Sequence, residues 1–348
     1  MAMNVESGEG SMSIAKPVSS GLSAVYRRNL QGLALVPAII ALTIVGAMIN
    51  PAFLTTGNLF ENILGFSSAL GVLVIAESII LIGGNIDLSL QSTVGFSVVL
   101  FCFLTGGGDS GGPGLGWTPL PAASATLVVA ICIGLFNGFI VSVLKLNAFI
   151  VTLAMLILLQ GLTLGISNGQ TYTNVPEAIL FLGTGQILGI PVQALIFIGA
   201  FLIAGLFMAY MPTGRAIYAL GGNPTAAFAA GIKTGRLTIG LFVFGSLMAV
   251  VAGVLLLSQV ASAPPNLGAN IIFTVFAAAV LGGIDLNGGR GSIVGAALGV
   301  LMLSIIQNIL ILSSVPSFWI DAVYGAIIVA TLTVGRLPML RRRFMRPR

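Results

Sequence analysis

Histidine is absent from the 348-residue sequence, and cysteine occurs only twice. The absence of histidine removes the commonest metal ligand and the side chain that most often moves protons near neutral pH. Both cysteines, Cys102 and Cys132, fall within long apolar runs. They therefore suit packing among apolar neighbours, and they predict neither a disulfide framework nor a metal site.

Charged residues are scarce as well. They make up 7% of the chain, while hydrophobic residues make up 57%. A soluble globular domain usually carries about 25% charged residues, so a soluble protein of this size would lack the polar surface that it needs. The composition excludes a soluble enzyme and predicts a chain that lies almost entirely within a membrane.

A nucleotide-binding loop is also missing. The chain contains no Gly-x-x-x-x-Gly-Lys-Ser/Thr motif, and none of its lysines follows a glycine. Without that motif there is no glycine-rich loop to hold phosphates. The short Gly289-Arg290-Gly291 sequence is interpreted as a tight cytoplasmic bend. Any ATP-driven activity would therefore need an ATPase on a separate chain.

Apolar runs of about twenty residues recur along the chain, which is the length that a helix needs to cross the hydrocarbon core. The runs are continuous rather than alternating, so they favour helices over the strands of a barrel. The sequence therefore predicts an all-α, polytopic membrane helical bundle with about ten transmembrane helices. The predicted spans are 31–50, 58–82, 88–105, 122–144, 148–167, 191–211, 237–258, 270–283, 292–312 and 317–336.

The positions of lysine and arginine predict the orientation of the bundle. With the N-terminus in the cytoplasm, all 14 basic residues fall on the cytoplasmic side of the ten spans, and the C-terminus is cytoplasmic too. The basic residues are interpreted as topology signals and membrane-lipid contacts, and no nucleic-acid partner is predicted. The predicted parts are an N-terminal tail (1–30), a transmembrane domain (31–336) with a cytoplasmic loop (212–236), and a basic C-terminal tail (337–348).

The most informative cytoplasmic segment runs from Pro212 to Ile232. Asn223-Pro224 favours the start of a helix, because asparagine caps a helix and proline suits its first turn. Small residues follow, and Gly231 supplies a stop. The pattern predicts a short surface helix with a small-residue face, flanked by Arg215 and Lys233, that a partner can approach closely. An ordinary interfacial turn is the alternative.

In this segment, Ala226-Ala227 followed by Gly231 resembles the permease loop of ABC importers. In that family two alanines and a later glycine form the coupling helix that docks on the ATPase subunit. Thr225 stands where a glutamate often precedes the alanine pair. The wider pattern is similar to permeases of ribose- and xylose-type sugar importers. It consists of Gly214-Arg215, Tyr218-Ala219, Gly222-Asn223, Ala226-Ala227 and Gly231-Ile232.

Three further segments agree with this resemblance, which extends from about Gly57 to Gly335. The sequence Gly84–Ser89 is similar to a Gly-Gly-Ile-Asp-Leu-Ser signature, with Asn85 in place of one glycine. Asn147–Leu153 matches a Phe-Ile-x-Thr-Leu stretch, and Leu281–Ser292 matches a Leu-Gly-Gly…Gly-Gly-x-Gly-Ser turn. The four segments together identify the chain as resembling this family.

The resemblance implies the non-catalytic, membrane-spanning subunit of a bacterial inner-membrane importer for a monosaccharide or a similar small polyhydroxylated solute. It implies three protein partners: a cytoplasmic ATP-binding subunit, a second permease chain that is identical or related, and a periplasmic or extracellular solute-binding protein. It implies no cofactor on this chain, since ATP and Mg belong to the ATPase. The chain departs from the family at Ile272 and Thr274, which align with acidic residues in relatives, so the identity of the solute is not carried over.

Polar residues within apolar spans are further candidates, because a charge near the bilayer centre costs about 2.5–3.5 kcal/mol and such residues tend to face the bundle interior or water. Glu77 lies in the second predicted span, and it is either a pathway residue or a partner in a buried interhelical hydrogen bond. Asp87 follows the span, where a cap of the next helix is favoured over a pathway role. The other candidates for the pathway are Asn85, Asn147, Phe149, Thr152, Gln160 and Asn308, with Gln259 and Gln307 as further neutral hydrogen-bonding groups.

Two other functions stay open at this point. One is a secondary transporter driven by an ion gradient, with Glu77 and Asp87 as ion-linked carboxylates. The other is an ABC permease for a nucleoside or a furanose signal molecule, which the departure at Ile272 and Thr274 keeps open.

Glycine pairs spaced by four residues occur at Gly134–Gly138 and Gly161–Gly165. Such spacing favours close helix packing in membranes. Packing within one chain is the favoured interpretation, and a seam between two chains is the alternative.

Overall fold

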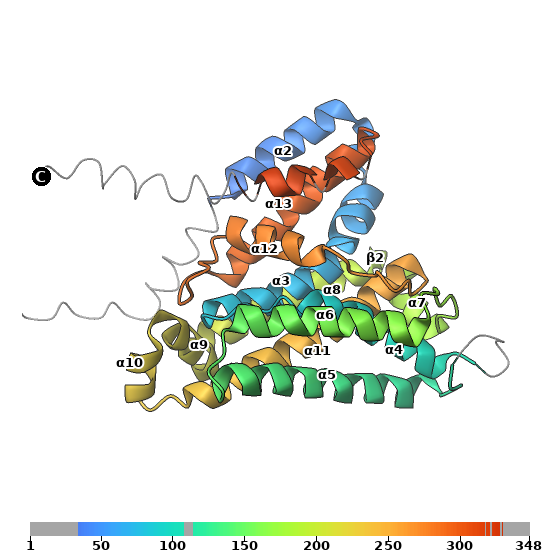
Figure 1. The fold of residues 1–348 in the computed structure, drawn as a ribbon. Helices are drawn as coiled ribbons and strands as arrows, with labels where there is room; N and C mark the ends of the chain where they lie inside the picture. Colours follow the sequence, from blue (N-terminus) through green and yellow to red (C-terminus); the bar gives the residue numbers. More distant parts are fainter. Residues whose placement is uncertain (1–33, 108–113, 317, 321, 328, 330–348) are drawn as a thin grey trace, which may run out of the picture.

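The structure is a computed structural model that describes residues 34–107, 114–316, 318–320, 322–327 and 329. The chain is a helical membrane protein, as the composition predicts (Figure 1). Its main helices are α2 (Val36–Ile49), α3 (Ser67–Ile82), α4 (Leu90–Thr105), α5 (Pro119–Ser142), α6 (Ala148–Ser167), α8 (Val192–Tyr210), α11 (Thr234–Val260), α12 (Ile271–Leu281) and α13 (Ile293–Leu312). The predicted tails, 1–30 and 337–348, lie outside the described residues.

Helix lengths differ across the bundle. Among the described residues six helical stretches are long and apolar enough to span a bilayer: Asn58–Ile82, Pro119–Ser142, Ala148–Ser167, Val192–Tyr210, Thr234–Val260 and Ile293–Leu312. The first of these joins η2 (Asn58–Gly65), a π-helical stretch, to α3. Four apolar stretches are shorter: α2, α4, α12 and Phe318–Ile327. Each of these helices overlaps a predicted span, and residues 330–336 of the last predicted span lie outside the described residues.

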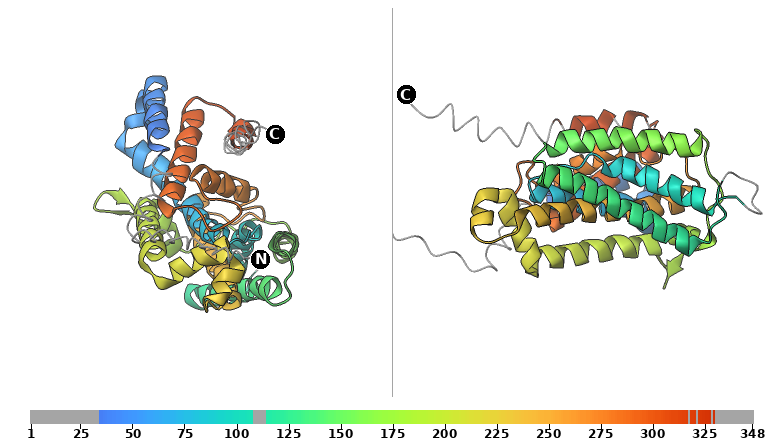
Figure 2. Two further views of the ribbon diagram at one scale, coloured as in Figure 1. Left: turned by 90° about the vertical axis from the view of Figure 1, so that its left-hand side faces the viewer. Right: turned by 60° about the horizontal axis from the view of Figure 1, so that its bottom comes forward.

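The smaller elements gather at the two ends of the bundle. At one end lie α9 (Pro212–Gly222) and α10 (Pro224–Ala229). At the opposite end lie α7 (Glu177–Thr184) and a hairpin of β1 (Gln186–Ile187) with β2 (Ile190–Pro191), while η1 (Pro51–Leu54) follows α2. The long helices run between these ends, as both Figure 1 and the second view of Figure 2 show.

Helix α3 is the centre of the bundle. All of its residues except Leu70 are buried, and it packs against α8, α11, α12 and α13. Helices α5, α6 and α8 instead leave most of their apolar surface uncovered within the chain. Apolar surface of this extent is stable in contact with lipid tails, which is the environment that the composition predicts.

One of the two glycine pairs serves packing within the chain. Methyl groups on Gly134 and Gly138 of α5 would lie 2.5 and 2.7 Å from the Cα atoms of Val243 and Ile239 in α11. The absence of side chains therefore lets α5 and α11 approach closely, as predicted. The same prediction is wrong for the second pair, because a methyl group on Gly161 or Gly165 would meet nothing within 4 Å among the described residues.

Candidate functional site

The predicted surface helix between Asn223 and Gly231 is present as α10. The side-chain oxygen of Asn223 accepts a hydrogen bond from the Ala226 amide at 3.0 Å, and Pro224 occupies the first helical position. After α10 the backbone turns at Gly231, whose φ of +85° is favourable for glycine. The local signals in the sequence are therefore the ones that set both ends of this helix.

The alanine pair of α10 is divided between two faces. Ala227 is 4% exposed, whereas Ala226 is exposed and Phe228 is 70% exposed. The surface that α10 offers to a partner therefore includes Ala226 and Phe228 but not Ala227. The sequence pattern predicts the small-residue face of this loop, and the exposed Phe228 ring adds a large apolar group to it.

Two predicted residues at the start of α9 have different surroundings. Gly214 is buried, and a methyl group there would lie 2.8 Å from the carbonyl oxygens of Phe207 and Met208. This glycine therefore allows α9 to fold back on the end of α8. Arg215 is exposed, and its guanidinium donates to the Tyr210 carbonyl oxygen at 3.4 Å.

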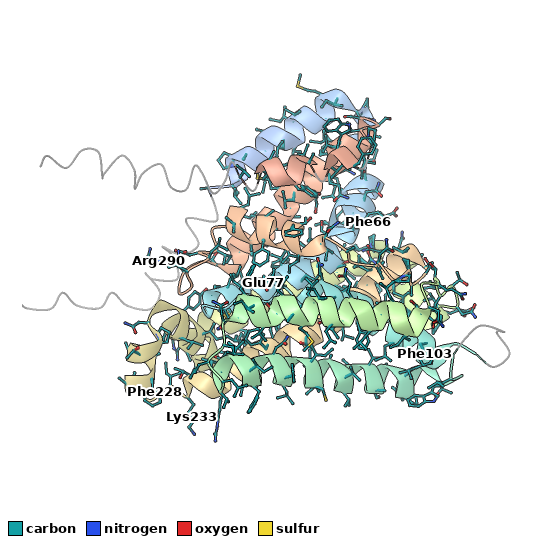
Figure 3. The ribbon with its side chains drawn as sticks, in the orientation of Figure 1. Phe66, Glu77, Phe103, Phe228, Lys233 and Arg290 are labelled. Carbon is teal, nitrogen blue, oxygen red and sulfur yellow. The ribbon has the colours of Figure 1, made fainter. Side chains whose placement is uncertain are left out.

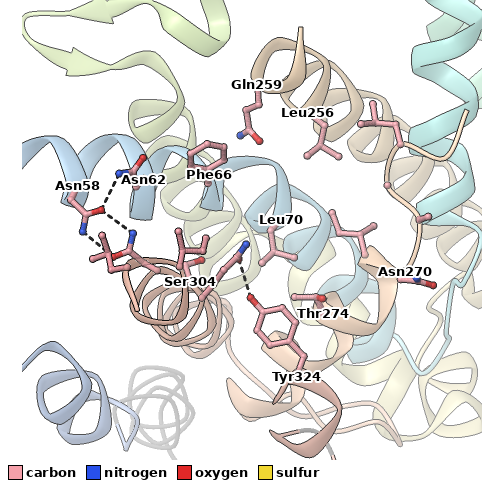
Figure 4. Close-up of a pocket in the computed structure, with 18 residues that line it drawn as sticks. Asn58, Asn62, Phe66, Leu70, Leu256, Gln259, Asn270, Thr274, Ser304 and Tyr324 are labelled. Carbon is pink, nitrogen blue, oxygen red and sulfur yellow. Dashed lines mark hydrogen bonds between the residues drawn. The ribbon is translucent and has the colours of Figure 1, made fainter. Parts of the chain in front are cut away.

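A cavity of about 630 Å³ opens near the α7 end of the bundle (Figure 4). Its walls come from η2 and α3, the end of α11, the loop before α12, and α12, α13 and the stretch 318–327. The polar side chains that line it are amides and hydroxyls. They are Asn58, Asn62, Gln259, Asn270, Thr274, Ser304, Gln307, Asn308 and Tyr324.

Two amide side chains on facing helices are hydrogen-bonded to each other at the wall of this cavity. Asn58 of η2 and Asn308 of α13 are buried, and each donates to the other's side-chain oxygen at 2.9 Å. Asn62 also donates to the Asn58 oxygen at 3.0 Å, and the Tyr324 hydroxyl donates to the Gln307 oxygen at 2.9 Å. These bonds hold η2, α13 and the last described stretch around one polar space.

No charged residue lines this cavity among the residues that the structure describes. The Phe66 ring lies at its wall, with more than half of its surface exposed. Amides and hydroxyls can donate to and accept from hydroxyl groups, and an aromatic face can cover the apolar face of a small ring. Such a lining suits a neutral, polyhydroxylated solute and offers no counter-charge to an ionic one.

A second cavity of about 360 Å³ adjoins the first and shares Asn62, Phe66 and Gln259 with it. It is also lined by Glu61 and by the hairpin residue Gln186, whose amide donates to the Glu61 carboxylate at 3.2 Å. The shared wall places Phe66 and Gln259 between the two spaces. The Gln259 amide is held there by bonds to the Gly65 carbonyl and the Gln193 oxygen.

The predicted acidic residues lie elsewhere, in a separate buried polar cluster. Glu77 and Asp87 are both fully buried, and the Asp87 backbone amide donates to the Glu77 carboxylate at 3.3 Å. One Asp87 oxygen accepts from the backbone amide and the hydroxyl of Ser89, at the start of α4, and the Asn137 amide donates to that hydroxyl. These contacts favour a capping role for Asp87. One oxygen of each acid has no hydrogen-bond partner.

The remaining candidates from the sequence do not gather at the cavity. Thr152 belongs to the buried cluster, where its hydroxyl accepts from the Leu88 amide at 3.1 Å. Asn147 caps α6 through the Phe149 amide, and both Phe149 and Gln160 are exposed on the outside of α6. Asn85 donates to the Gly83 carbonyl in the turn after α3. Of the eight predicted pathway residues, only Asn308 lines the 630 Å³ cavity.

Asn58, Asn62 and Phe66 line the cavity but are not among the pathway residues predicted from the sequence. They stand four residues apart, with Leu70 next in the series, so they share one side of a helix. Amides repeated at that spacing inside an apolar span are a signal that the sequence does contain. Thr274, which departs from the acidic residue that the family usually carries, also lines the cavity.

A bundle of apolar helices around an uncharged polar cavity is the arrangement expected of a membrane transport protein. The chain belongs to the family described as "Branched-chain amino acid transport system / permease component", which matches residues 59–332. It is accordingly a multi-pass protein of the bacterial inner membrane, and the predicted relationship to ABC import permeases is confirmed.

Similar proteins are import permeases for more than one solute. The ribose import permease protein RbsC of Escherichia coli (strain K12) is 32% identical over 85% of this chain and 91% of its own length. The xylose transport system permease protein XylH of the same strain is 29% identical over 93% of this chain and 96% of its own. The autoinducer 2 import system permease protein LsrC of Salmonella paratyphi B is 34% identical over 81% and 80%. No solved structure matches this chain.

Proposed function

We propose that this chain is the membrane-spanning permease subunit of an ATP-driven importer for a monosaccharide or a similar small polyhydroxylated solute. The observation that carries the proposal is the uncharged lining of the 630 Å³ cavity by amides, hydroxyls and Phe66. The relatives named for ribose and xylose import support the same class of solute.

The lining also argues against an amino acid as the solute, although the family description mentions one. A free amino acid carries an ammonium and a carboxylate group. Burying either group without a partner of opposite charge is strongly unfavourable. The cavity provides no such partner among the described residues, whereas a sugar needs only the neutral hydrogen bonds that are present.

The orientation proposed here places α9 and α10 in the cytoplasm, with about ten spans and both chain ends inside. The basic residues within the described ranges support it, because all of them are exposed and border the α9–α10 end: Lys145, Arg215, Lys233, Arg236 and Arg290. Arg290, Lys233 and Phe228 lie at that same end of the bundle (Figure 3). A basic end facing the cytoplasm agrees with the usual distribution of positive charge.

The proposed assembly has the same partners that the sequence resemblance implies. A cytoplasmic ATPase, which supplies ATP and Mg, docks on the α9–α10 loop. A second permease chain completes the pathway, and an external binding protein delivers the solute. The role of this chain is to bind and release the solute in response to ATP hydrolysis on the partner, without catalysis of its own.

A furanose signal molecule is a second candidate solute, because the relative LsrC is named for autoinducer 2 import. A furanose is polyhydroxylated as well, so the amides and hydroxyls of the same cavity could bind it.

The test of the proposed function is affinity purification from mild detergent, followed by an ATPase assay and reconstitution into liposomes. We expect an ATP-hydrolysing chain to be recovered with this chain. We also expect the liposomes to take up labelled ribose, xylose or a furanose when ATP is present, and not to take up leucine. Leucine uptake would contradict the assignment of the solute class. Recovery of the chain without an ATPase, with uptake under a proton or sodium gradient, would contradict the ATP-driven mechanism.

The Asn62→Leu substitution is expected to raise the KM for the transported solute about tenfold, which corresponds to the loss of about 1.4 kcal/mol. Asn62 lines the cavity, and leucine keeps a similar volume while removing both hydrogen-bonding groups. Initial uptake rates at several solute concentrations measure the effect. The matched control is Gln160→Leu, which removes an exposed amide on α6 away from the cavity. Equal KM values for the two variants would count against this cavity as the solute site.

A further inference from the structure

Three backbone turns meet at the α9–α10 end of the bundle. They are the turn after α3, with Gly83 and Gly84, the end of α9, with Gly221 and Gly222, and the turn before α13, with Gly288 and Gly289. We call these six residues the glycine junction. They come from segments more than sixty residues apart in the sequence, so the junction is a tertiary feature.

The approach of the three turns is closer than side chains allow. A methyl group on Gly221 would overlap the Ile82 carbonyl oxygen and lie 2.6 Å from the Gly289 nitrogen. A methyl group on Gly288 would lie 2.7 Å from the Gly84 Cα, and one on Gly289 would lie 2.6 Å from the Gly222 Cα. Contacts of Cβ atoms at these distances force the backbone to shift. Glycine at Gly221 is therefore required by the close approach.

Two hydrogen bonds connect the same segments. The Gly289 amide donates to the Ile82 carbonyl at the end of α3, at 2.8 Å. The Tyr218 hydroxyl of α9 donates to the Gly291 carbonyl at 2.9 Å. The end of α9 is thus bonded or packed to the turns that follow α3 and precede α13.

Two of these helices, α3 and α13, reach the cavity at the ends that lie away from the junction. Helix α3 continues from η2, which carries Asn58 and Asn62, and its 16 residues correspond to about 24 Å of rigid helix. Helix α13 starts just after the junction and carries Ser304 and Asn308 into the opposite wall of the cavity. Helix α9 leads directly into α10. The junction therefore joins the proposed docking element to both helices that hold the Asn58–Asn308 pair.

We infer that Gly221 is a positioning residue that transmits movement of the α9–α10 loop to α3 and α13, and so to the solute cavity. The inference rests on the proposed function. Movement of α10 during the ATP cycle displaces the end of α9, and close backbone packing leaves little slack at the junction to absorb that movement. The two sides of the cavity then separate or close where Asn58 and Asn308 meet.

The test compares Gly221→Ala with Gly222→Ala in the full complex with its co-purifying ATPase. A methyl group at Gly222 would meet nothing within 4 Å, so the control places the same group one residue further along the same helix. We expect the Gly221→Ala complex to retain its ATPase and its ATP hydrolysis but to move at least tenfold less solute per ATP. The Gly222→Ala complex should match the wild type.

Tyr218→Phe provides a second variant, which removes the hydroxyl that donates to the Gly291 carbonyl and keeps the ring. We expect a two- to fivefold fall in solute moved per ATP, with an unchanged amount of bound ATPase. Normal coupling in both Gly221→Ala and Tyr218→Phe would overturn the inference. So would loss of the ATPase from Gly221→Ala together with normal coupling in Tyr218→Phe, because the role would then be structural. A wild-type chain that recovers no ATPase would instead overturn the proposed function, before the variants are compared.

Discussion

Phe228→Asp is expected to abolish solute uptake and to remove the ATPase from the purified complex. Phe228 is the large apolar side chain on the outer face of α10, and it is 70% exposed within the chain. Exposed aromatic side chains of this kind often supply much of the binding energy of a protein interface. An aspartate there would place an unpaired charge in the interface on docking. Co-purification followed by an uptake assay measures both losses.

The matched control for this variant is Phe181→Asp on α7. Phe181 is also exposed, at 52%, and it lies at the opposite end of the bundle from α10. The ATPase should remain bound to the Phe181→Asp complex. An unchanged amount of ATPase bound to the Phe228→Asp complex would contradict docking at α10.

Ala227→Asp would be a poorer test of docking, although the motif draws attention to that alanine. Ala227 is nearly completely buried against its own chain. A buried aspartate there would destabilise the fold of the loop whether or not a partner docks on it. The motif identifies the helix from its pattern of residues, but only the tertiary contacts tell which side of the helix is free.

The spans themselves were predictable because their signal is local. A run of about twenty apolar residues has one stable arrangement in a bilayer, since every backbone polar group must be satisfied within the helix. The boundaries of α10 were predictable for a similar reason. Asn223, Pro224 and Gly231 act on their immediate neighbours, and the hydrogen bond from Ala226 to Asn223 is such a local contact.

The solute cavity was much less predictable, because it depends on which way each amide faces. Gln160 and Asn308 are both amides within apolar spans, yet one is exposed on the outside of α6 and the other lines the cavity. The difference arises from the packing of α13 against α3 and η2. The spacing of Asn58, Asn62 and Phe66 places them on one side of a helix, but it does not predict that α13 packs opposite that side.

Of the two buried acids, Asp87 has contacts that agree with the favoured interpretation of a helix cap, whereas Glu77 shows a further limit of sequence reasoning. A glutamate in an apolar span suggests a pathway residue, an ion site or a buried hydrogen bond, and the sequence alone leaves all three open for Glu77. The structure places Glu77 and Asp87 in a cluster apart from the cavity lining. The contacts of Asp87 with Ser89 are those of a local cap. Substitutions of Asp87 and Glu77 are expected to change the stability of the protein in opposite directions, so thermal unfolding distinguishes the two acids.

Asp87→Ala is expected to lower the free energy of unfolding by about 2 kcal/mol, because it leaves buried donors of Ser89 without their acceptor. In a chain of 348 residues such a loss lowers the thermal midpoint by about a few degrees. Thermal unfolding of the purified complex in detergent measures the shift. An unchanged midpoint would show that the bonds to Ser89 do not hold the start of α4.

Glu77→Gln is expected to act in the opposite direction. The five basic residues within the described ranges are all exposed, so none neutralises the buried pair. Glutamine keeps an oxygen to accept from the Asp87 amide, and it removes a group whose ionised form would lie unpaired beside Asp87. We expect a thermal midpoint that is a few degrees higher than that of the wild type and ATP-driven uptake within twofold of it. Glu61→Gln, at an exposed site, is the control and should leave the midpoint unchanged.

If Glu77 were instead the ion-linked carboxylate of a gradient-driven transporter, Glu77→Gln would abolish transport while the fold survived. This single variant therefore distinguishes a buried structural acid from an energy-coupling one.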